Sequence, residues 1–474
     1  MNGLAENGIS EKALQRFFRE IKKQEIDLHS MVIWRNGERV FLTYGYPFSP
    51  ESMHRMYSSA SILLALAILK AVEENKLSLK DKVRKYYKDR LPDEYEKNSG
   101  TLTIAQLLCM YTGENFSYNK SVFTILVQIV EKAVLSDYIE YLQQKFFKYM
   151  DICIFEDKEM CSFSDPLGLS IRMKDFPKLA ELVLNKGVWN DMRLLDVNLT
   201  ERLGRYQVST AQPQNSEEIY TDRSYGYGSL LWRNRGGGFR IDGEYGQYSL
   251  IFPDLNMAVS IMAFEEDQEI ILDLFWKYVY PYIWECKIPE EEKDNEDFAS
   301  EYKALFDWTR VDSEKNWIEG HTYVLQENPV GLQKLNFRYE DDRIIIAGVQ
   351  NGEEFSFAAG LKGNYCINAQ HLRILESCWN RKHLCKNTDE YYITGEFYKA
   401  DDFTGKKEIR IFIRNLNHTE YCLFNFRIAD DGIRIELDNG AWYCVKKRAR
   451  IETSTDMTIP IIIYGSEGEN DESI

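Results

Sequence analysis

Apolar positions in the N-terminal part of the chain recur with two different periods. Spacings of three and four residues predict helices, which we place at 11–23, 62–74, 104–110, 122–134, 136–147, 175–185 and 268–284. Short runs rich in β-branched and aromatic residues predict strands, which we place at 31–34, 39–44, 225–232, 238–243, 247–252 and 257–264. Asn36-Gly37, between the first two strands, is a strong hairpin signal. Strands, an inserted helical layer, further strands and a last helix together predict a mixed α/β (α+β) domain.

The pattern changes after residue 288. Residues 289–300 form a charged, acidic run that predicts a linker. Beyond this run, short strands with polar turns between them are predicted at 323–325, 343–347, 355–358, 391–398, 408–413, 421–428 and 433–437. Such a series is typical of an antiparallel sandwich or barrel of roughly eight strands. We therefore expect a domain at 1–288, an antiparallel β domain at 301–464, and an acidic, disordered tail at 465–474.

Length and charge narrow the class of protein. A chain of 474 residues is longer than one hydrophobic core usually supports, which favours two domains. Its hydrophobic content of 44% and charged content of 28% are those of a soluble globular protein. A net charge of −17 disfavours nucleic acid and anionic membranes as partners, because both attract basic surfaces.

Cysteine content and the N-terminal residues bear on location. Nine cysteines, an odd number over a long chain, fit reduced thiols better than a disulfide framework. Residues 1–7 have neither the basic start nor the apolar core of a signal peptide. No apolar run reaches the length of about 18 residues that suggests a spanning helix. We expect a cytoplasmic protein that acts on a small-molecule or peptide ligand, with an oligomeric state that the sequence does not reveal.

The chemistry of the chain centres on residues 56–61. Met56-Tyr57-Ser58-Ser59-Ala60-Ser61 leads into an apolar helix, which is followed by Lys76-Leu77-Ser78-Leu79. This stretch resembles the nucleophile helix of the serine β-lactamase and penicillin-binding-protein superfamily, whose members carry Tyr-Ser-x-Ser-Lys here. On that register Ser58 is the nucleophile, and Ser61 stands where the family has its lysine.

Further motifs with the same resemblance follow in order. Phe116-Ser117-Tyr118-Asn119-Lys120 resembles the family's Tyr-x-Asn motif. Residues 167–175 and 184–189 resemble a stretch that follows this motif in relatives. Residues 242–247, Asp-Gly-Glu-Tyr-Gly-Gln, resemble the strand that carries the third motif. The resemblance extends from about Met31 to about Ile283 and implies a β-lactamase/DD-peptidase-like fold for this part of the chain.

The resemblance also implies roles for the matched positions. In the family a carbonyl substrate acylates the serine, and water then hydrolyses the acyl intermediate. A lysine one helical turn later accepts the serine proton, because positions i and i+3 share a helix face. Tyr118 would supply a proton relay, and the third-motif strand a backbone donor to the oxyanion. We place the substrate and oxyanion contacts at Asp242, Gly243, Gly246 and Gln247.

Three positions depart from the family pattern. Ser61 replaces the lysine, Lys120 replaces the asparagine, and Ile241 stands where lysine or histidine is expected. Loss of a general base typically lowers a rate by a factor of about 10² to 10⁴. We therefore do not expect an efficient β-lactamase.

Two functions from different classes fit these departures. In the first, the protein is a serine hydrolase that acts on an ester, amide or peptide, and Lys120 or Tyr118 has become the base for Ser58. In the second, it is a catalytically silent descendant that binds a peptide or metabolite in the former cleft. His29 and His54 lie near this cleft on the same register and are expected to be structural. Cys378, His383 and Cys385 have a metal-like spacing, but zinc sites prefer Cys-x₂-Cys pairs, so we expect neither a metal nor a cofactor.

Overall fold

The computed structural model of the protein describes most of the chain. The described residues are 3–24, 26–45, 47–156, 167–210, 221–284, 320–340, 343–361, 366–368, 391–399, 407–415, 421–429, 432–438 and 461–467. The chain divides into two compact units, Met1–Tyr302 and Lys303–Ile474. The predicted linker at 289–300 lies outside the described residues.

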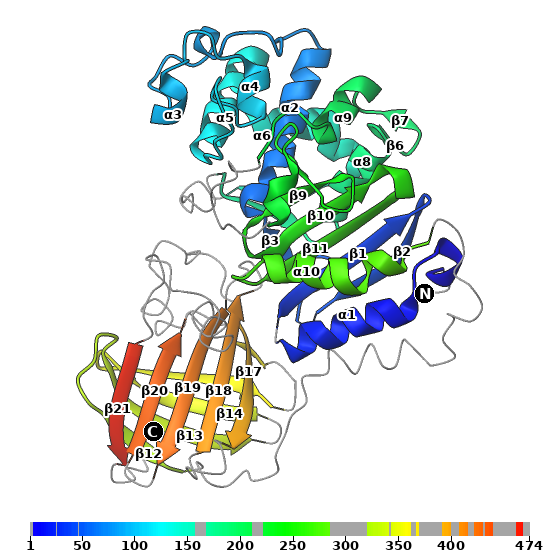
Figure 1. The fold of residues 1–474 in the computed structure, drawn as a ribbon. Coiled ribbons are helices and arrows are strands. Elements are labelled where there is room, and N and C mark those ends of the chain that lie inside the picture. The colour runs from blue at the N-terminus through cyan, green and yellow to red at the C-terminus, as the bar shows by residue number, and fades with distance from the viewer. Residues whose placement is uncertain are drawn as a thin grey trace, which may run out of the picture. The chain divides into compact units, whose positions relative to one another are not determined.

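A six-stranded antiparallel sheet forms the base of the first unit (Figure 1). Its order is β2-β1-β11-β10-β9-β8, so β1 pairs with β11, a strand more than two hundred residues later. The strands are β1 (Asp27–Arg35), β2 (Glu38–Tyr44), β8 (Trp232–Arg233), β9 (Phe239–Gly243), β10 (Gln247–Phe252) and β11 (Met257–Phe264). The predicted Asn36-Gly37 hairpin joins β2 to β1.

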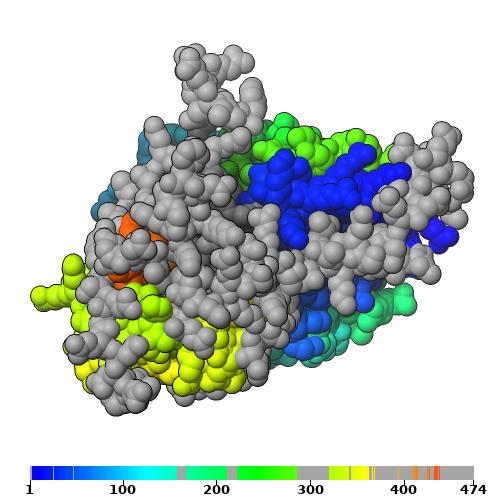
Figure 2. All heavy atoms as spheres, turned by 90° about the horizontal axis from the view of Figure 1, so that it is seen from below, coloured from blue at the N-terminus to red at the C-terminus, as the bar shows by residue number. Residues whose placement is uncertain are grey.

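Helices lie on both faces of this sheet. In Figure 1, α1 (Glu11–Lys23) and α10 (Glu269–Tyr278) run together along one face, and α8 (Phe176–Leu184) lies against the other. Helix α1 begins where predicted because Ser10 Oγ accepts a hydrogen bond from Ala13 N, which caps the helix. Its apolar stripe is buried, whereas Arg16 and Arg19 are exposed, as expected for an amphipathic helix. Figure 2 shows N-terminal residues, in dark blue, at the surface of the molecule.

The helical layer is built around α2 (Ser61–Glu73). This helix is apolar on all sides, and all but its last residues are buried, so it forms the centre of the layer. The other helices are α3 (Asp93–Glu96), α4 (Ile104–Leu108), α5 (Ser121–Val134), α6 (Tyr138–Leu142), α7 (Lys148–Met150) and α9 (Val197–Gly204). The predicted helix at 136–147 consists of α6 and a π-helical turn, η4 (Gln143–Phe147).

Two predicted elements of the first unit are wrong in extent. Of the strand predicted at 225–232, only Trp232 lies in a strand, because the chain reverses here: Leu230 has a φ of 60°, and Tyr227 pairs back with Trp232 in an isolated bridge. The helix predicted at 268–284 ends at Tyr278, and a short turn, η9 (Tyr280–Tyr282), follows. Pro281 lacks a backbone donor, which explains why the helix does not continue.

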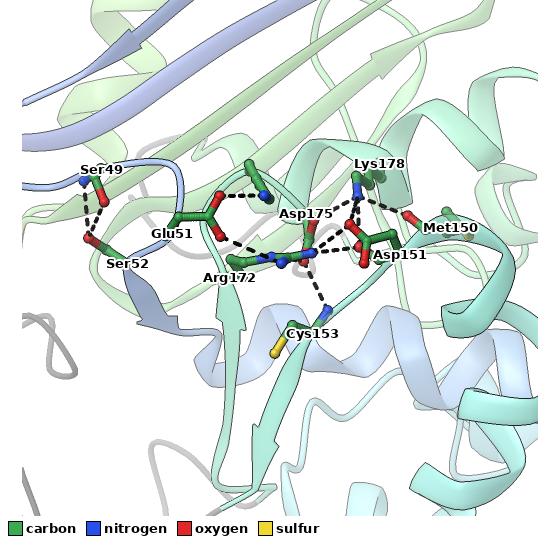
Figure 3. A network of polar contacts seen from close by, with 10 residues as sticks. Ser49, Glu51, Ser52, Met150, Asp151, Cys153, Arg172, Asp175 and Lys178 are labelled. Atoms are coloured by element: carbon green, nitrogen blue, oxygen red, sulfur yellow. Dashed lines mark hydrogen bonds and ion pairs between the residues drawn. The ribbon is translucent and has the colours of Figure 1, made fainter.

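A small sheet leads the chain into the Ser58 region. It has the order β3-β5-β4, with β3 (Met53–Arg55), β5 (Leu169–Arg172) and β4 (Ile154–Glu156). Asp175 is fully buried and accepts hydrogen bonds from Arg172 Nε at 2.7 Å and Cys153 N at 2.9 Å, and it pairs with Lys178 (Figure 3). This network anchors β5, the direct neighbour of β3. A second small pair, β6 (Val188–Trp189) and β7 (Met192–Arg193), lies beyond α8.

Both ends of the described part of the first unit meet at Arg35. This buried guanidinium donates hydrogen bonds to the carbonyl oxygens of Gly8, at 3.3 Å, and Trp284. Trp284 N in turn donates to Gly8 O at 2.8 Å, and Ile9 and Ile283 form a bridge beside it. The first and last segments are thus joined to each other and to the sheet.

The second unit is an antiparallel sheet of ten strands. Its order is β15-β14-β13-β12-β21-β20-β19-β18-β17-β16, and β15 also pairs with β17, so the sheet closes on itself as a barrel. Aromatic and aliphatic side chains such as Phe337, Ile346 and Phe424 are buried together and form its core. The strands are β12 (Thr322–Leu325), β13 (Leu332–Glu340), β14 (Arg343–Gln350), β15 (Glu353–Gly360), β16 (Cys366–Asn368), β17 (Tyr391–Lys399), β18 (Lys407–Asn415), β19 (Tyr421–Ala429), β20 (Gly432–Asp438) and β21 (Ile461–Glu467).

Two features of this unit differ from expectation. Strand β13 falls in a segment for which the sequence predicted no strand. The disordered tail expected from residue 465 is wrong for residues 465–467, because β21 pairs with β20 and β12 and closes the order of the sheet. Residues 468–474 lie outside the described residues. Within the described part of the chain, no helix is long and apolar enough to cross a membrane.

Candidate active site

Ser58 lies in a tight turn directly before α2. The turn, η2 (Tyr57–Ala60), is a 3₁₀ helix, so Ser58 precedes the α-helix by one short turn. Tyr57 has a φ of 49°, a left-handed conformation that costs about 1–3 kcal/mol for a residue with a side chain. The Arg55 guanidinium lies 5.9 Å from the centre of the Tyr57 ring and packs over it. The surroundings therefore hold Ser58 in a strained turn.

Glu244 is the direct partner of Ser58. Ser58 Oγ donates a hydrogen bond of 2.9 Å to Glu244 Oε2. The ammonium group of Lys120 donates to the other oxygen, Oε1, and forms an ion pair with it. The Ser58 residue is 3% exposed, and the side chains of Lys120 and Glu244 are 10% and 23% exposed. One carboxylate thus bridges a serine hydroxyl and an ammonium in a largely buried site.

The close approach of β9 to the serine turn explains this contact. A Cβ atom on Gly243 would lie 2.7 Å from Met56 O and 2.8 Å from Ser59 N, so only glycine fits here. Because Gly243 touches the serine turn, the next residue, Glu244, is delivered to Ser58. Gly243 was predicted at the site, but Glu244 was missed. An acidic residue immediately after the third-motif glycine was the available signal.

A second left-handed tyrosine follows Glu244. Tyr245 has a φ of 61°, its ring packs against Tyr57 at 5.0 Å, and it stacks on Phe264 at 4.8 Å. Each reactive residue therefore has a strained tyrosine beside it, Tyr57 before Ser58 and Tyr245 after Glu244. The contact between the two rings stabilises both turns.

Tyr118 also lies at this site, as predicted. Burial raises the pKa of its phenol well above the usual value, the negative charge of Glu244 raises it further, and a hydrogen bond with Ser58 lowers it in part. The phenol is therefore protonated at neutral pH. This protonation state argues against Tyr118 as the base and suits a proton donor. Its ring belongs to an aromatic wall with Trp232, at 5.4 Å, and Tyr227, at 6.2 Å.

Lys120 reaches the site from the start of α5. It is the residue before the first helical position, and it places its ammonium on Glu244. A general base must be unprotonated, whereas an amine held by a carboxylate is the charged form. Lys120 therefore contacts Glu244, whose other carboxylate oxygen accepts the hydrogen bond from Ser58.

The remaining predicted residues have structural contacts. Ser61 Oγ donates to Leu230 O at 3.3 Å, so its hydroxyl binds main chain and does not serve Ser58. Asp242 pairs with Arg240 Nε at 2.8 Å and with Arg223 Nη2 at 3.3 Å, and its predicted role as a substrate contact stays a prediction.

The last two predicted contacts shape the turn after Glu244. Gly246 has a φ of 90°, and a Cβ atom on it would lie 2.6 Å from Ile271 Cδ1. The amide of Gln247 is fully buried and donates to Glu244 O at 3.0 Å and Ala263 O at 2.8 Å. Both residues fix the backbone around Glu244, and their predicted role as substrate or oxyanion contacts stays a prediction.

Among the described residues, no cluster of three histidine, cysteine, aspartate or glutamate side chains has the arrangement of a metal site. Cys378, His383 and Cys385 lie outside the described residues. Cys366 is described and has a free thiol.

Part of the first unit matches a known protein family. Residues 14–152 match the family model described as Beta-lactamase. This part of the chain has the β-lactamase-family fold. The matched segment contains Ser58, Tyr118 and Lys120, and it ends before Glu244. The resemblance inferred from the motifs is thereby confirmed at the level of the fold.

Curated relatives and solved structures are similar at low identity. Protein flp of Staphylococcus aureus strain NCTC 8325 is 23% identical over 199 residues, which cover 32% of this chain and 40% of that protein. The chain therefore spans less than half the length of this relative. A penicillin-binding-protein homologue from Pyrococcus abyssi, described as octameric, superposes with a TM-score of 0.44 at 15% identity over 94% of this chain and 97% of its own. A protein described as a putative 6-aminohexanoate-dimer hydrolase from Bacillus anthracis gives a TM-score of 0.44 at 17% identity, over 55% and 79% of the two chains.

Proposed function

We propose that the first unit is a serine hydrolase that forms an acyl intermediate on Ser58, with Glu244 as the base. The observation that carries this proposal is the 2.9 Å hydrogen bond from Ser58 Oγ to Glu244 Oε2. A serine hydroxyl is a weak nucleophile unless an adjacent group accepts its proton, and Glu244 is the carboxylate in that position. The substrate is a small molecule or peptide with a reactive carbonyl.

The proton route of the acylation step follows from this contact. Ser58 Oγ attacks the carbonyl carbon, its proton passes to Glu244 Oε2, and the carbonyl π electrons move onto the oxygen. When the tetrahedral intermediate collapses, Glu244 returns the proton to the departing alcohol or amine, and acyl-Ser58 remains. Water then repeats the sequence with Glu244 as the acceptor. The carboxylic acid leaves, and Ser58 regains its proton.

Lys120 and Tyr118 support the charge changes in these steps. While Glu244 is ionised, Lys120 balances its charge and fixes its orientation. Once Glu244 takes the proton, the field of the ammonium acts instead on the negative charge that develops on the substrate oxygen. Tyr118, with its raised pKa, stays a neutral donor throughout.

This arrangement favours esters over β-lactams. A carboxylate is a weaker base than an amine, so it suits substrates with a good leaving group. The family cation at the third motif is replaced by Ile241, whose side chain is fully buried. We expect nitrocefin and penicillin G to be turned over far more slowly than β-lactamases do, and activated esters to be preferred.

A second function is favoured by the closure of the site. Ser58 is nearly inaccessible, and its hydroxyl is already bonded to Glu244. A silent relative that binds a peptide or metabolite in the same cleft would keep these contacts without turnover.

Labelling with a fluorophosphonate probe, followed by peptide mapping, separates the two functions. For a hydrolase we expect modification at Ser58 that is absent in Ser58→Ala. Labelling should also slow strongly in Glu244→Gln, because the glutamine amide cannot accept the serine proton. Loss of labelling in Lys120→Ala together with unchanged labelling in Glu244→Gln would instead identify the amine as the base. A parent protein that is not labelled at any pH would overturn the hydrolase proposal and favour the binding protein.

A further inference from the structure

A buried chain of hydrogen bonds ends two residues before Tyr57. His54 Nδ1 lies 3.0 Å from Arg55 O, His54 Nε2 lies 2.8 Å from His29 Nδ1, and His29 Nε2 lies 2.9 Å from Asp27 Oδ2. Both histidines are fully buried, and Phe48 stacks on His29 at 4.0 Å. The chain connects β1 of the main sheet with β3, which leads to the serine turn.

The partners decide where the protons are. Arg55 O is a carbonyl and only accepts, so His54 Nδ1 carries a proton. Burial, together with the neighbouring His29, holds the pKa of His54 well below its usual value, so this ring is neutral and its Nε2 has no proton. His29 Nδ1 must therefore donate to His54 Nε2.

The same reasoning leaves His29 with two protons. Its Nδ1 proton is engaged by His54, so a neutral His29 would present a lone pair on Nε2 to the Asp27 carboxylate. Two acceptors 2.9 Å apart repel each other, and the contact becomes a hydrogen bond only with one further proton. Imidazole is the more basic of the two groups, with a free value of about 6.5 against 3.9 for aspartate.

We infer that Asp27 and His29 hold this proton as a buried carboxylate–imidazolium pair, and that the protonated chain positions the Ser58 turn through the Arg55 carbonyl. The second part rests on the proposed function of Ser58. Within the described residues, the titratable and charged groups that face His54 are His29 and Asp27 on β1, with the Arg55 carbonyl on its own strand. Arg55 meanwhile packs over the strained Tyr57 ring, next to the nucleophile.

Removal of the shared proton leaves this chain of hydrogen bonds with one contact that cannot form. With two ring protons left for three contacts, one contact must place two lone pairs against each other. The defect can lie at Asp27, between the two histidines, or at Arg55 O, depending on the tautomers. A rise in pH should therefore loosen the serine turn once the proton is released.

The proton count can be measured on the intact protein by nitrogen NMR with labelled histidine. At pH 7 we expect His29 with both ring nitrogens protonated, and His54 neutral with its proton on Nδ1. The Asp27→Asn variant is the matched control, because an asparagine amide can donate to His29 Nε2 and complete the chain without the extra proton. A neutral His29 in the parent at pH 7, or a proton on Nε2 of His54, would overturn the assignment.

Two variants of His54 test the positioning role. In His54→Asn the side-chain amide lies where Nδ1 was and can still donate to Arg55 O, whereas in His54→Gln it lies where Nε2 was. We expect probe labelling of Ser58 to fall at least 10-fold in His54→Gln and less than 3-fold in His54→Asn, with both variants folded by circular dichroism. Equal losses would indicate packing alone and would overturn the positioning role.

The pH dependence supplies a readout that packing would not change. Labelling of the parent should decline at alkaline pH in step with the His29 nitrogen signals, and Asp27→Asn should lack this decline. If the parent is not labelled at all, the proposed function fails by itself. Hydrogen exchange at the Tyr57 and Ser58 amides then replaces labelling in the same comparison, and equal exchange in the two His54 variants would overturn the positioning role.

Discussion

Two acidic residues at the end of β9 have opposite surroundings. The Asp242 side chain is 3% exposed and is held by Arg240, which is fully buried, and by Arg223. The Glu244 side chain is 23% exposed, and it has a lysine on one oxygen and a serine hydroxyl on the other. A carboxylate surrounded by arginines is part of the framework. On the proposed function, a carboxylate that also accepts from the Ser58 hydroxyl is the acceptor of its proton.

The backbone between them creates this difference. Asp242 lies in the strand, where its side chain meets the buried Arg240 on the same strand. Gly243 then lets the backbone touch the serine turn, and Glu244 begins η7 (Glu244–Gly246) beside it. Asp242 and Glu244 are two positions apart and therefore differ: Asp242 stabilises the fold, whereas Glu244 has the catalytic role that we propose.

The largest expected effect is on activity and comes from Glu244→Gln. This change keeps the shape of the side chain but removes the proton acceptor, so labelling of Ser58 should slow about 10²- to 10⁴-fold. That loss corresponds to roughly 3–5 kcal/mol of activation free energy. Asp254→Asn, at an exposed position in the next turn, is the control and should label like the parent. Unchanged labelling of Glu244→Gln would contradict the distinction between Asp242 as a structural residue and Glu244 as the base.

The next effect is on stability and comes from Asp242→Asn. Removal of this carboxylate leaves Arg240 buried without its charged partner, which typically costs about 3–5 kcal/mol. Urea unfolding of the parent and the variant measures the difference. Glu244→Gln should change the unfolding free energy far less, because Glu244 is partly exposed. Equal destabilisation by both variants would contradict the division of roles.

The same residues show how much of the candidate site could be predicted from the sequence. Local signals located Ser58, Tyr118, Lys120 and Gly243, because each lies in a short motif whose neighbours resemble a known pattern. Helix α1 was predicted with its observed bounds, since a serine cap and an amphipathic stripe lie within one segment. Glu244 was missed because it contacts Ser58 across 186 residues of sequence. No local pattern reveals that Gly243 lies against the serine turn.

The strands of the second unit teach the same lesson. Strand β21 has an acidic end that suggested a tail, yet it pairs with β12 on one side and β20 on the other, in the middle of the sheet. The errors lie where long-range pairing determines the structure. In the first unit, the aromatic run at 225–232 packs its rings and does not form a ladder, which a strand signal alone does not distinguish.

The buried, uncharged His54 should make the free energy of unfolding depend on pH in the acid range. The pKa of His54 is lowered in the folded state, so the unfolded chain takes up a proton there that the folded chain does not. Stability from this residue is complete above the free value of about 6.5 and falls as the pH decreases below it, by up to roughly 1.4 kcal/mol per pH unit. His54→Asn should remove this contribution. Urea unfolding between pH 5 and 7 tests it, and parallel curves for the two proteins would disprove it.

The smallest effect is expected at an exposed ion pair. The charged groups of Arg90 and of Asp93, the first residue of α3, lie 2.6 Å apart, but the two side chains are 77% and 85% exposed. Solvent screens such pairs, so Arg90→Ala should change the unfolding free energy by less than about 0.5 kcal/mol. A loss comparable to that of Asp242→Asn would mean that burial does not explain the contrast between the acids.

The order of the main sheet has a consequence for synthesis. Strand β1 pairs with β11, Arg35 opposite Met257, so this partner leaves the ribosome only after roughly 220 further residues. At about 5–20 residues per second, the newly made β1–β2 hairpin waits for tens of seconds with one apolar edge unpaired. A nascent chain in this state is a natural client for a chaperone that shields strand edges. Expression should therefore respond more to conditions during translation than the stability of the finished fold would suggest.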